Sequence, residues 1–467
     1  MIFRVSSHTD YLGSGSTYVA IAGKDYNGID FIEQAIARGA TKIVVQKDQL
    51  ISTTVKKQCQ QRAIEIIVVD DARRALAEYA ARAYDYPARK LKIFAVTGTD
   101  GKTTSTYLLY HMLKAANKKV ALLSGVQNII ADQIFPVNLT TAKPDFLHYF
   151  FDQCVQTGIE YVAMEVSAQA ASLHRIDGIQ FAGGIFTNLA HEHGECYADL
   201  QKYFQAKSII FGQFVQKAPL VVHEHEWAHK VRERFADVMS CGFSQEANCQ
   251  IVCLQETLHR QIIEFHWDGE WHVFESQLVG PYNALNIGGA ALLACRIGIP
   301  VDAVKRAIKI FTGAKGRFER YPLPNGSLAI IDYAHTPQAY LALLNRLRRY
   351  ARRLIVVFGA AGGKDIAKRP IMGKIAAQYC DFVVLTNDNP RHEDPAVIMS
   401  QVMANLSLDE RASVVCEPDR ERAIAQAYAL AGAGDIIAIL GKGGETVQIV
   451  GKQRLAYSDE RVVRGLM

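Results

Sequence analysis

The stretch Lys92-Ile-Phe-Ala-Val-Thr-Gly-Thr-Asp-Gly-Lys-Thr-Thr-Ser-Thr106 determines how the rest of this chain is interpreted. Residues 93–96 form a short apolar run, of the length expected for a buried strand. The glycine-containing segment 98–104 follows, and after it apolar residues recur at helical spacing on one face. The residues of that face are Leu108, Leu109, Met112, Leu113 and Ala116. The stretch therefore predicts a strand, a loop and a helix in direct succession.

A strand, a glycine loop with Lys-Thr, and a helix, in that order, are typical of a phosphate-binding loop. Glycines allow a tight turn that brings backbone N–H groups to phosphate oxygens, and the helix N-terminus adds a favourable field. Lys102 can reach the β- and γ-phosphates, and the Thr103 hydroxyl suits Mg²⁺. The residues predicted to bind a nucleoside triphosphate are Gly98, Thr99, Asp100, Gly101, Lys102, Thr103 and Thr104. A plain glycine turn before a helix is the alternative, because the leading glycine of the commonest motif is missing.

Length and composition are those of an ordinary soluble, globular protein. The 467 residues predict two or three domains, and 49% hydrophobic with 21% charged residues is a normal balance. The net charge of +5, from 52 basic and 47 acidic residues, gives no argument for nucleic-acid binding. The sequence has no apolar run of membrane-spanning length and no signal peptide, and its nine cysteines are scattered. We expect a cytoplasmic protein that binds neither membranes nor nucleic acid.

The alternation of apolar runs and helical patterns divides the chain into three predicted domains. Residues 1–88 predict a small α/β domain. Residues 89–313 predict a central ATPase-like domain, with a parallel sheet around the phosphate loop and a small extra sheet formed by short strands between 218 and 278. Residues 314–467 predict a doubly wound, Rossmann-like α/β domain. The fold class is therefore α/β.

Three positions in the central segment have a functional and an ordinary interpretation. Glu165 ends a predicted strand, where nucleotide sites hold Mg²⁺, but a surface or helix-capping glutamate fits as well. His191-Glu192-His193 would suggest zinc, yet i, i+2 spacing in a loop is not a usual zinc pattern, and a solvated pair fits equally. Lys207 lies in a predicted helix, where a lysine is ordinarily solvated.

Polar residues follow the predicted strands of the last segment. They lie in Asp332-Tyr-Ala-His-Thr-Pro337, Asp388-Asn-Pro-Arg391 and Gly441-Lys-Gly-Gly-Glu445. Ligands of open α/β sheets bind at the carboxyl ends of strands, so this set predicts a polar small-molecule site. Each group could also be plain turn chemistry.

The order and spacing of these motifs resemble those of the Mur ligases, ATP-dependent amide-forming enzymes of peptidoglycan synthesis. The resemblance covers nearly the whole chain and depends on the shared order of many motifs, not on one of them. Besides the segments above, these motifs are Thr140-Thr141, Met164-Glu-Val-Ser167, His174-Arg175, Phe186-Thr-Asn-Leu189, His193 with Lys207, Asn283 with Asn286, Gly316-Arg317 and Lys368-Arg-Pro-Ile-Met-Gly373.

The resemblance implies a monomeric enzyme whose three domains bind, in chain order, a UDP-sugar, ATP and an amino acid. It implies a catalytic set of Lys102, Glu165, His193 and Lys207, with Mg²⁺ held by Thr103, Glu165, His193 and a carbamylated Lys207. ATP would also be bound by Asn283, Arg317, Asp332 and His335. The nucleotide-peptide substrate would be held by Ser6, Thr140, Thr141, Ser167 and Arg175, and the amino acid by Lys364, Asp388, Asn389, Arg391, Gly441 and Glu445.

The implied reaction adds meso-diaminopimelate to UDP-N-acetylmuramoyl-L-Ala-D-Glu through an acyl phosphate. The motif Asp388-Asn-Pro-Arg391 resembles the family pattern for diaminopimelate, because a guanidinium can clamp the distal carboxylate of this amino acid. Lysine has no such carboxylate. Glu445 would pair with the distal ammonium.

Several positions depart from the family pattern, mostly on the side expected to hold the UDP-sugar peptide. Val5-Ser6-Ser7 stands for an Asp-Ser-Arg, Leu139 for an asparagine, Ala168-Gln169 for Ser-His and Leu173 for a glutamine. Lys364 replaces an arginine and Gly444 a histidine near the expected amino-acid site.

Three alternatives to the diaminopimelate-adding ligase remain from sequence. The first is a Mur-like amide ligase that acts on a different carboxylate. The second is a P-loop ATPase or kinase, which leaves Lys207 and residues 388–391 unexplained. The third is an inactive nucleotide-binding module, which would require loss of Lys102, Glu165 or His193, although all three are present.

Overall fold

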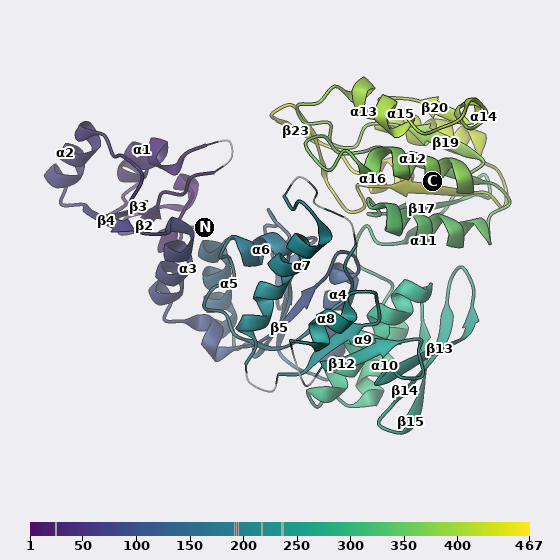
Figure 1. The fold of residues 1–467 in the computed structure, drawn as a ribbon, viewed down its shortest axis with the longest axis horizontal. Helices are drawn as coiled ribbons and strands as arrows, with labels where there is room; N and C mark the ends of the chain where they lie inside the picture. The colour runs from purple at the N-terminus through teal and green to yellow at the C-terminus, as the bar shows by residue number, and fades with distance from the viewer. Residues whose placement is uncertain (24–25, 191, 193, 195, 216–217, 235–237) are drawn as a thin grey trace.

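The computed structural model describes residues 1–23, 26–190, 192, 194, 196–215, 218–234 and 238–467. Its three large parts are a purple N-terminal part, a blue to green central part and a green to yellow C-terminal part (Figure 1). Each part is built around its own sheet, and each sheet lies within one of the three domains predicted from sequence. The domain boundaries themselves stay a prediction.

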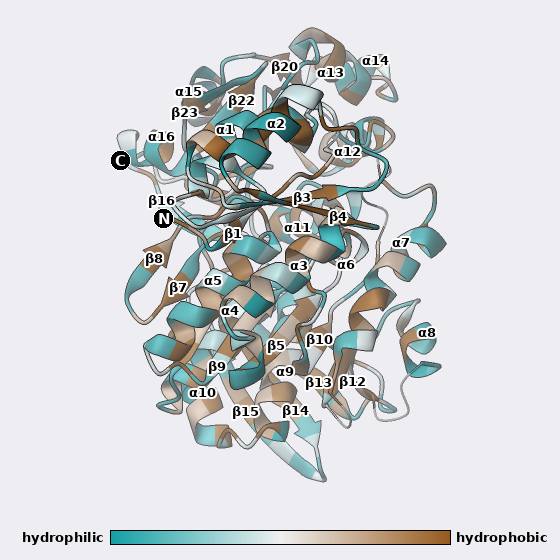
Figure 2. Cartoon of the chain, turned by 90° about the vertical axis from the view of Figure 1, so that its left-hand side faces the viewer, coloured by the Kyte–Doolittle hydropathy of each residue, from teal (hydrophilic) through white to brown (hydrophobic). Residues whose placement is uncertain are grey.

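The N-terminal sheet is parallel, in the order β1-β2-β3-β4. Its strands are β1 (Val5–Ser6), β2 (Thr17–Val19), β3 (Lys42–Gln46) and β4 (Glu65–Val69), and its helices are α1 (Ile32–Ala37), α2 (Thr53–Gln61) and α3 (Ala72–Ala83). One core cluster combines strand residues with α1 and α2 and another combines them with α3, so the helices cover both faces. In Figure 2, β3 and β4 are largely hydrophobic. Alternation of strand and helix predicted this domain, but sequence reasoning missed β1 and α2.

The central sheet has the order β15-β14-β13-β12-β11-β10-β5-β9-β6-β7-β8. Its strands are β5 (Lys92–Thr97), β6 (Val120–Leu123), β7 (Asn128–Ile130), β8 (Gln133–Phe135), β9 (Tyr161–Glu165), β10 (Phe181–Phe186), β11 (Leu220–His223), β12 (Val238–Gly242), β13 (Cys249–Glu256), β14 (Gln261–Trp267) and β15 (Glu270–Ser276). The parallel part of the sheet consists of β13, β12, β11, β10, β5, β9 and β6, and both ends of the sheet finish in antiparallel hairpins.

One expectation about this sheet differs from the structure. The short strands at 218–278 do not form a sheet of their own, because β12 pairs in parallel with β13 and joins them to the central sheet. The apolar runs 93–96 and 120–123, on either side of the helix after the phosphate loop, indicate a β-α-β unit from sequence, and the structure contains it as β5, α4 and β6, with β9 between the two strands in the sheet. Sequence pattern fixes which residues are strands, whereas the pairing order depends on contacts between segments far apart in the chain.

Helices cover both faces of the central sheet. One core cluster joins the strands to α4 (Lys102–Ala115), α9 (Pro281–Arg296) and α10 (Val301–Ile310). The cluster on the other face includes α5 (Pro144–Gln156), α6 (Ala168–Ser172), α7 (Leu200–Ser208) and α8 (Ala228–Arg232). This double cover explains why the central strands read as continuous apolar runs. Among the described residues, no helix is long and apolar enough to cross a bilayer.

The C-terminal sheet has the order β16-β17-β21-β18-β19-β20, with only β16 antiparallel to its neighbour. Its strands are β16 (Glu319–Pro322), β17 (Leu328–Asp332), β18 (Leu354–Phe358), β19 (Phe382–Leu385), β20 (Val414–Cys416) and β21 (Ile436–Leu440). One face carries α11 (Pro337–Arg348), α12 (Lys368–Tyr379) and α13 (Pro395–Val402), and the other carries α15 (Arg420–Leu430) and α16 (Asp459–Gly465). The short helix α14 (Leu408–Ala412) and a hairpin of β22 (Val447–Val450) and β23 (Gln453–Ala456) complete the domain. The doubly wound prediction for this segment is confirmed.

Polar contacts join the central and C-terminal parts at two places. The β13–β14 hairpin reaches α11, where Arg346 Nη2 donates to Thr257 O at 2.9 Å. Near the phosphate loop, Arg317 Nη2 lies 3.3 Å from Thr103 Oγ1. Residues that follow β17, β18, β19 and β21 line a cleft together with residues of the central domain, so the carboxyl ends of these strands face the central domain.

Candidate active site

A cleft of about 420 Å³ opens where the phosphate loop faces the strand ends of the C-terminal sheet. Both domains contribute to its wall. The predicted site residues that line it are Lys102, Thr140, Ser167, Arg175, Lys207, His335, Lys364, Asp388, Asn389, Arg391, Gly441 and Glu445. Twelve positions spread over more than 340 residues of sequence thus face one space.

The phosphate loop joins β5 to α4, and its shape depends on two glycines. Gly98 has φ +146°, and an added Cβ would lie 1.9 Å from Thr187 Oγ1. Gly101 has φ +82° and caps α4, whose first N–H groups have no carbonyl to bond within the helix. Asn188 Oδ1 accepts from Thr99 N at 3.2 Å and from Asp100 N at 2.8 Å, which fixes the first half of the loop. The remaining amides at the helix N-terminus can bind an anion.

Two lysines meet at this loop. Lys102 Nζ donates to Gly98 O at 3.1 Å and to Thr99 O at 2.7 Å. Lys207 Nζ donates to the same Gly98 O at 2.6 Å and lies 4.4 Å from the centre of the Tyr203 ring. Burial, and then the charge of Lys102, hold the pKa of Lys207 well below its usual value. Lys207 is therefore not the solvated lysine of the ordinary interpretation, and its neutral amine is favoured.

Glu165 ends β9 beside the loop and is 1% exposed. Its Oε1 accepts from Gly125 N at 3.1 Å. Burial raises the pKa of Glu165, while Lys102, Arg317 and hydrogen bonds from Gly125 and Thr103 oppose that rise. The surface-glutamate interpretation is therefore wrong. His193, the other predicted ligand, lies outside the described residues.

Residues predicted to bind ATP fall into two groups. Arg317 stacks over Tyr333 at 4.2 Å and reaches Thr103, and Asp332 accepts from Phe318 N and Ala334 N, both at 2.7 Å. Both positions lie where the domains meet. Asn283 is 5% exposed at the start of α9 and accepts from Asn286 Nδ2 at 3.3 Å, behind the loop. The structure does not place Asn283 in the cleft wall.

His335 connects the two domains across the cleft. Its Nε2 lies 2.6 Å from Glu192 Oε1, and its Nδ1 lies 2.9 Å from Tyr333 O. Beside it, Thr336 Oγ1 lies 3.4 Å from Asp100 Oδ2. Burial, and then the charge of Glu192, raise the pKa of Asp100. These contacts hold the C-terminal domain close to the loop.

Three segments after strands of the C-terminal sheet form the opposite end of the cleft. Asn389 Nδ2 donates to Glu445 Oε2 at 2.9 Å, which joins the segments after β19 and β21. Arg391 has φ +55°, and its Nε is buried without a partner among the described residues. Gly441 has φ +105°, and a Cβ there would lie 2.7 Å from Asp388 Oδ2. A buried guanidinium nitrogen without a partner, facing a cleft, is suited to a carboxylate ligand.

Of the residues predicted to hold the nucleotide-peptide, Thr140, Ser167 and Arg175 line the cleft beside β9, whereas Thr141 is buried and is not part of the cleft wall. Thr141 Oγ1 donates to Glu165 O at 3.0 Å, Arg175 Nη1 donates to Thr141 O at 2.9 Å, and Ser167 caps α6. Thr140 is exposed to the cleft. Ser6 is different, because its buried hydroxyl lies 3.1 Å from Asp145 Oδ2 between the N-terminal and central domains. The structure does not bring Ser6 into the cleft.

Three family models match the chain in order. The Mur ligase family catalytic domain covers residues 9–84, the Mur ligase middle domain 96–294, and the Mur ligase glutamate ligase domain 316–443. A protein of Caldanaerobacter subterraneus named UDP-N-acetylmuramoyl-L-alanyl-D-glutamate--2,6-diaminopimelate ligase is 33% identical over 452 residues, 96% of this chain and 91% of that protein. A protein of the same name from Lawsonia intracellularis is 35% identical over 97% of this chain and 93% of its own length.

The chain belongs to the Mur ligase family. A solved structure of a ligase of that same name covers 100% of this chain and 94% of its own, at 25% identity with a TM-score of 0.65. A MurF ligase from Thermotoga maritima in complex with ADP covers 94% of this chain and 93% of its own, with a TM-score of 0.67 at 17% identity, which supports the fold alone. The resemblance seen in the sequence is confirmed.

Several positions that depart from the Mur ligase pattern lie in the cleft wall, namely Leu139, Ala168, Gln169 and Lys364. For Gly444, the structure gives a steric reason for the absence of a side chain. A Cβ at this position would lie 3.0 Å from Lys315 O, and a Cβ at the neighbouring Gly443 would lie 2.6 Å from Gly316 O. The loop 441–445 therefore lies against the segment that links the two domains.

Sequence reasoning did not assign some of the residues at this cleft. Glu192, Tyr203 and Tyr333 line the cleft, and Lys442 lies fully buried behind it. Glu192 stood between two histidines that drew attention to metal binding. Lys442 lies inside a glycine-rich motif, and a lysine directly after a predicted strand is the sequence signal that marks it.

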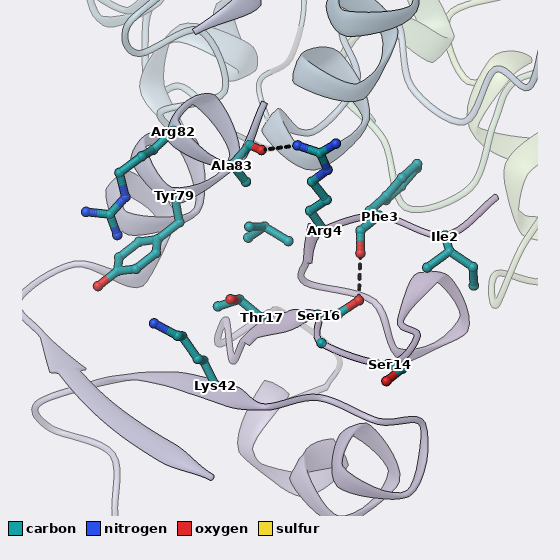
Figure 3. Close-up of a pocket in the computed structure, with 12 residues that line it drawn as sticks. Ile2, Phe3, Arg4, Ser14, Ser16, Thr17, Lys42, Tyr79, Arg82 and Ala83 are labelled. Carbon is teal, nitrogen blue, oxygen red and sulfur yellow. Dashed lines mark hydrogen bonds between the residues drawn. The ribbon is translucent and has the colours of Figure 1, made fainter. Parts of the chain in front are cut away.

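A second hollow, of about 360 Å³, lies on the N-terminal domain between α3 and the beginnings of β2 and β3. In Figure 3, Arg4, Lys42 and Arg82 surround it, and Arg4 Nη1 donates to Ala83 O at 2.7 Å. Lys42 lies 3.1 Å from Glu65, and Arg82 stacks over Tyr79 at 4.7 Å. Each of the three cations thus already contacts a carbonyl, a carboxylate or an aromatic ring of the protein, so we assign no ligand to this hollow.

Proposed function

We propose that this Mur ligase joins meso-diaminopimelate to UDP-N-acetylmuramoyl-L-Ala-D-Glu and uses ATP to activate the carboxylate. The observation that carries the proposal is the shared cleft, in which Lys102 and Arg391 line one cavity of about 420 Å³. The names of the relatives support the same activity. We further propose a cytoplasmic monomer with the domains 1–88, 89–313 and 314–467.

The reaction begins when the peptide carboxylate attacks the γ-phosphorus of ATP, which forms an acyl phosphate and releases ADP. Negative charge spreads over the transferring phosphoryl group. The N–H groups at the start of α4 and the Lys102 ammonium face that charge, and such fixed donors are worth several kcal/mol, of the order of 3. Arg317, which already contacts Thr103 Oγ1, would add a second cation.

Thr103 and Glu165 would hold Mg²⁺. The oxygens of a buried carboxylate and a neighbouring hydroxyl are the hard donors that this ion prefers, and phosphate or water oxygens would complete the shell. The described residues contain no group of three His, Cys, Asp or Glu side chains that could hold a metal ion, and His193 is the predicted further ligand. When bound, Mg²⁺ supplies charge neutralisation at the phosphates.

Lys207 would act as a carbamate. Carbamylation requires a neutral amine, which adds its lone pair to CO₂ and loses one proton to solvent. The depressed pKa of Lys207 provides that amine, and the product is an anionic, carboxylate-like group beside the phosphate loop. This conversion would turn a buried base into an oxygen donor.

In the second step the α-amine of the amino acid attacks the acyl carbonyl. The tetrahedral intermediate collapses, phosphate leaves with the C–O electron pair, and the amine loses a proton. Arg391 would bind the distal carboxylate of diaminopimelate through its unpartnered Nε, and Glu445 its distal ammonium. Closure of the C-terminal domain, held by His335 and Glu192, would exclude water from the acyl phosphate.

Phosphate release with UDP-N-acetylmuramoyl-L-Ala-D-Glu and ATP tests the proposal, with meso-diaminopimelate compared with lysine. Stimulation by diaminopimelate, together with a product heavier by one diaminopimelate residue, is expected. Lack of stimulation by either amine would overturn the proposed acceptor and favour a different carboxylate, in line with Leu139, Ala168 and Gln169 in the cleft wall. Phosphate release at the same rate with and without an amine would indicate an ATPase.

A further inference from the structure

A fully buried lysine lies directly behind the amino-acid end of the cleft. Lys442 follows Gly441 after β21, and its side chain has 0% exposure. Its Nζ donates to Glu445 Oε2 at 2.8 Å and to Asn389 Oδ1 at 3.1 Å. Asn389 and Glu445 line the cleft, whereas Lys442 does not. The ammonium is thus positioned to act on a ligand through its two neighbours.

The contacts of Lys442 fix the orientation of Asn389. The Oδ1 atom accepts from Lys442 Nζ and from Ile449 N at 2.9 Å, while Nδ2 donates to Glu445 Oε2 at 2.9 Å. A flipped amide would point two N–H groups at an ammonium and at a backbone N–H, so only one orientation is compatible with the network.

The same contacts fix Glu445. Its Oε2 accepts from both Lys442 and Asn389, so the torsion that places the carboxylate is held by two hydrogen bonds. The side chain is 32% exposed, so the carboxylate remains accessible from the cleft. An ammonium of a substrate would therefore meet a carboxylate that is already oriented.

Lys442 also balances local charge. Asp388 is buried beside it, and burial raises the pKa of Asp388 while Lys442 opposes the rise. The other charged groups acting on Asp388 are Glu445, Arg420 and Asp459, and Arg420 is paired with Asp459 at 2.8 Å. Tyr457 closes the other side, with its ring centre 5.8 Å from Lys442 Nζ. Loss of Lys442 would leave two neighbouring carboxylates with one cation fewer.

We propose that Lys442 is a positioning residue for the amino-acid substrate, holding Asn389 and Glu445 in the geometry that binds its polar side chain. This inference rests on the proposed function. It differs from a purely structural ion pair, which would affect folding stability and all substrates alike.

The test is the Lys442→Met variant, which keeps an unbranched side chain and removes the ammonium. With ATP and the nucleotide-peptide saturating, the KM for meso-diaminopimelate should rise about 10- to 100-fold, the range of a lost charge-assisted contact. The KM for ATP should stay within twofold of wild type. The acid limb of the pH profile of kcat/KM for diaminopimelate should move to higher pH, because Asp388 loses the cation that opposes the rise of its pKa.

The matched control is Lys374→Met, which removes a lysine from α12 of the same domain that pairs with Glu410 away from the cleft. It should leave each KM and the pH profile unchanged. A variant Lys442→Met with equal rises in the KM for ATP and for diaminopimelate, or with no rise in either, would overturn the proposal.

A second comparison covers the case in which Lys442→Met does not fold. Glu445→Gln and the double variant Lys442→Met/Glu445→Gln leave no unpaired anion at position 445. In that background, loss of Lys442 should raise the KM for diaminopimelate only about threefold, through Asn389 alone. If the double variant and Glu445→Gln had the same KM for diaminopimelate, the proposal would be overturned. A KM of the double variant 10 times that of Glu445→Gln would also overturn it, because Lys442 would then not act through Glu445.

Failure of the proposed function is distinguishable from failure of this inference. Wild-type protein without diaminopimelate-dependent phosphate release would overturn the function. Crystal structures of the wild type and the double variant would then decide the role of Lys442: a reoriented Asn389 amide supports it, and an unmoved amide overturns it.

Discussion

The two ends of the cleft each contain a buried lysine, and the two lysines have opposite surroundings. Lys207 is 1% exposed and lies against Gly98 O and the Tyr203 ring, next to the cation Lys102. Lys442 is 0% exposed and lies 2.8 Å from a carboxylate oxygen of Glu445. The same residue type at the same depth is thus prepared for different chemistry.

The comparison teaches that neighbours, and not burial alone, determine the charge of a buried amine. Burial, and then the neighbouring cation Lys102, lower the pKa of Lys207 and favour its neutral form, which the proposed carbamylation requires. Next to a carboxylate an ammonium is compensated and serves as a fixed hydrogen-bond donor. The predictions below test this contrast, from the largest expected effect to the smallest.

Lys102→Ala should have the largest effect. It removes the ammonium that faces the transferring phosphoryl group, so phosphate release should fall about 10³-fold or more. The circular dichroism spectrum and melting temperature should stay close to wild type, since the loop retains its bonds to Asn188. Lys114→Ala, in the last turn of the same helix, is the control and should keep full activity. Near-normal turnover of Lys102→Ala would refute the ATP assignment.

Lys207→Ala should lower kcat about 10²-fold, because it removes the proposed carbamate. Added acetate or formate should restore part of the rate to the variant, since a small carboxylate can occupy the vacated space. The same salts should not restore Lys102→Ala. A variant that keeps its rate, or a rate that acetate leaves unchanged, would argue against a carbamate at Lys207 and remove one side of the comparison.

Arg391→Ala should affect the amino-acid end only. Loss of a guanidinium that binds a carboxylate should raise the KM for meso-diaminopimelate about 30-fold and leave the KM for ATP unchanged. Discrimination against lysine should fall by the same factor, because lysine has no distal carboxylate. Equal increases in the KM for meso-diaminopimelate and for lysine would show that Arg391 does not bind that carboxylate.

His148→Leu should leave activity unchanged and alter only the pH dependence of stability. His148 lies in α5 with both ring nitrogens unpartnered among the described residues, and burial lowers its pKa to about 4. The unfolded state therefore binds the proton more tightly, and stability falls as pH drops through the window from 6.5 towards 4.

Between pH 7 and pH 5 the wild type should lose about 2 kcal/mol more free energy of unfolding than His148→Leu. Urea titrations at the two pH values measure this difference. Replacement of His259, a histidine at an exposed loop position, should reproduce the wild-type behaviour. Equal losses in wild type and His148→Leu would show that burial does not suppress protonation there.

Local parts of the fold could be predicted from sequence because their signals are contiguous. The strand β5, the loop and α4 follow one another within 24 residues, so periodicity and glycine placement were sufficient. The apolar runs 161–165, 354–358, 382–385 and 436–440 indicate strands from sequence and coincide with β9, β18, β19 and β21, because strands buried on both faces read as unbroken apolar runs. The merger of β13 to β15 with the central sheet was not predicted, since pairing order depends on distant contacts.

The sequence by itself determined the phosphate loop, the three α/β units and the Mur ligase resemblance, because glycine conformation, apolar periodicity and motif order act over short distances. Only the tertiary structure decided that Ser6 is buried against Asp145, that Asn283 lies behind the loop, and that Lys442 supports Asn389 and Glu445. These contacts join residues that are 3 to 139 positions apart in the sequence. The charge and accessibility of a side chain depend on the groups that surround it in the folded protein, and sequence spacing does not reveal them.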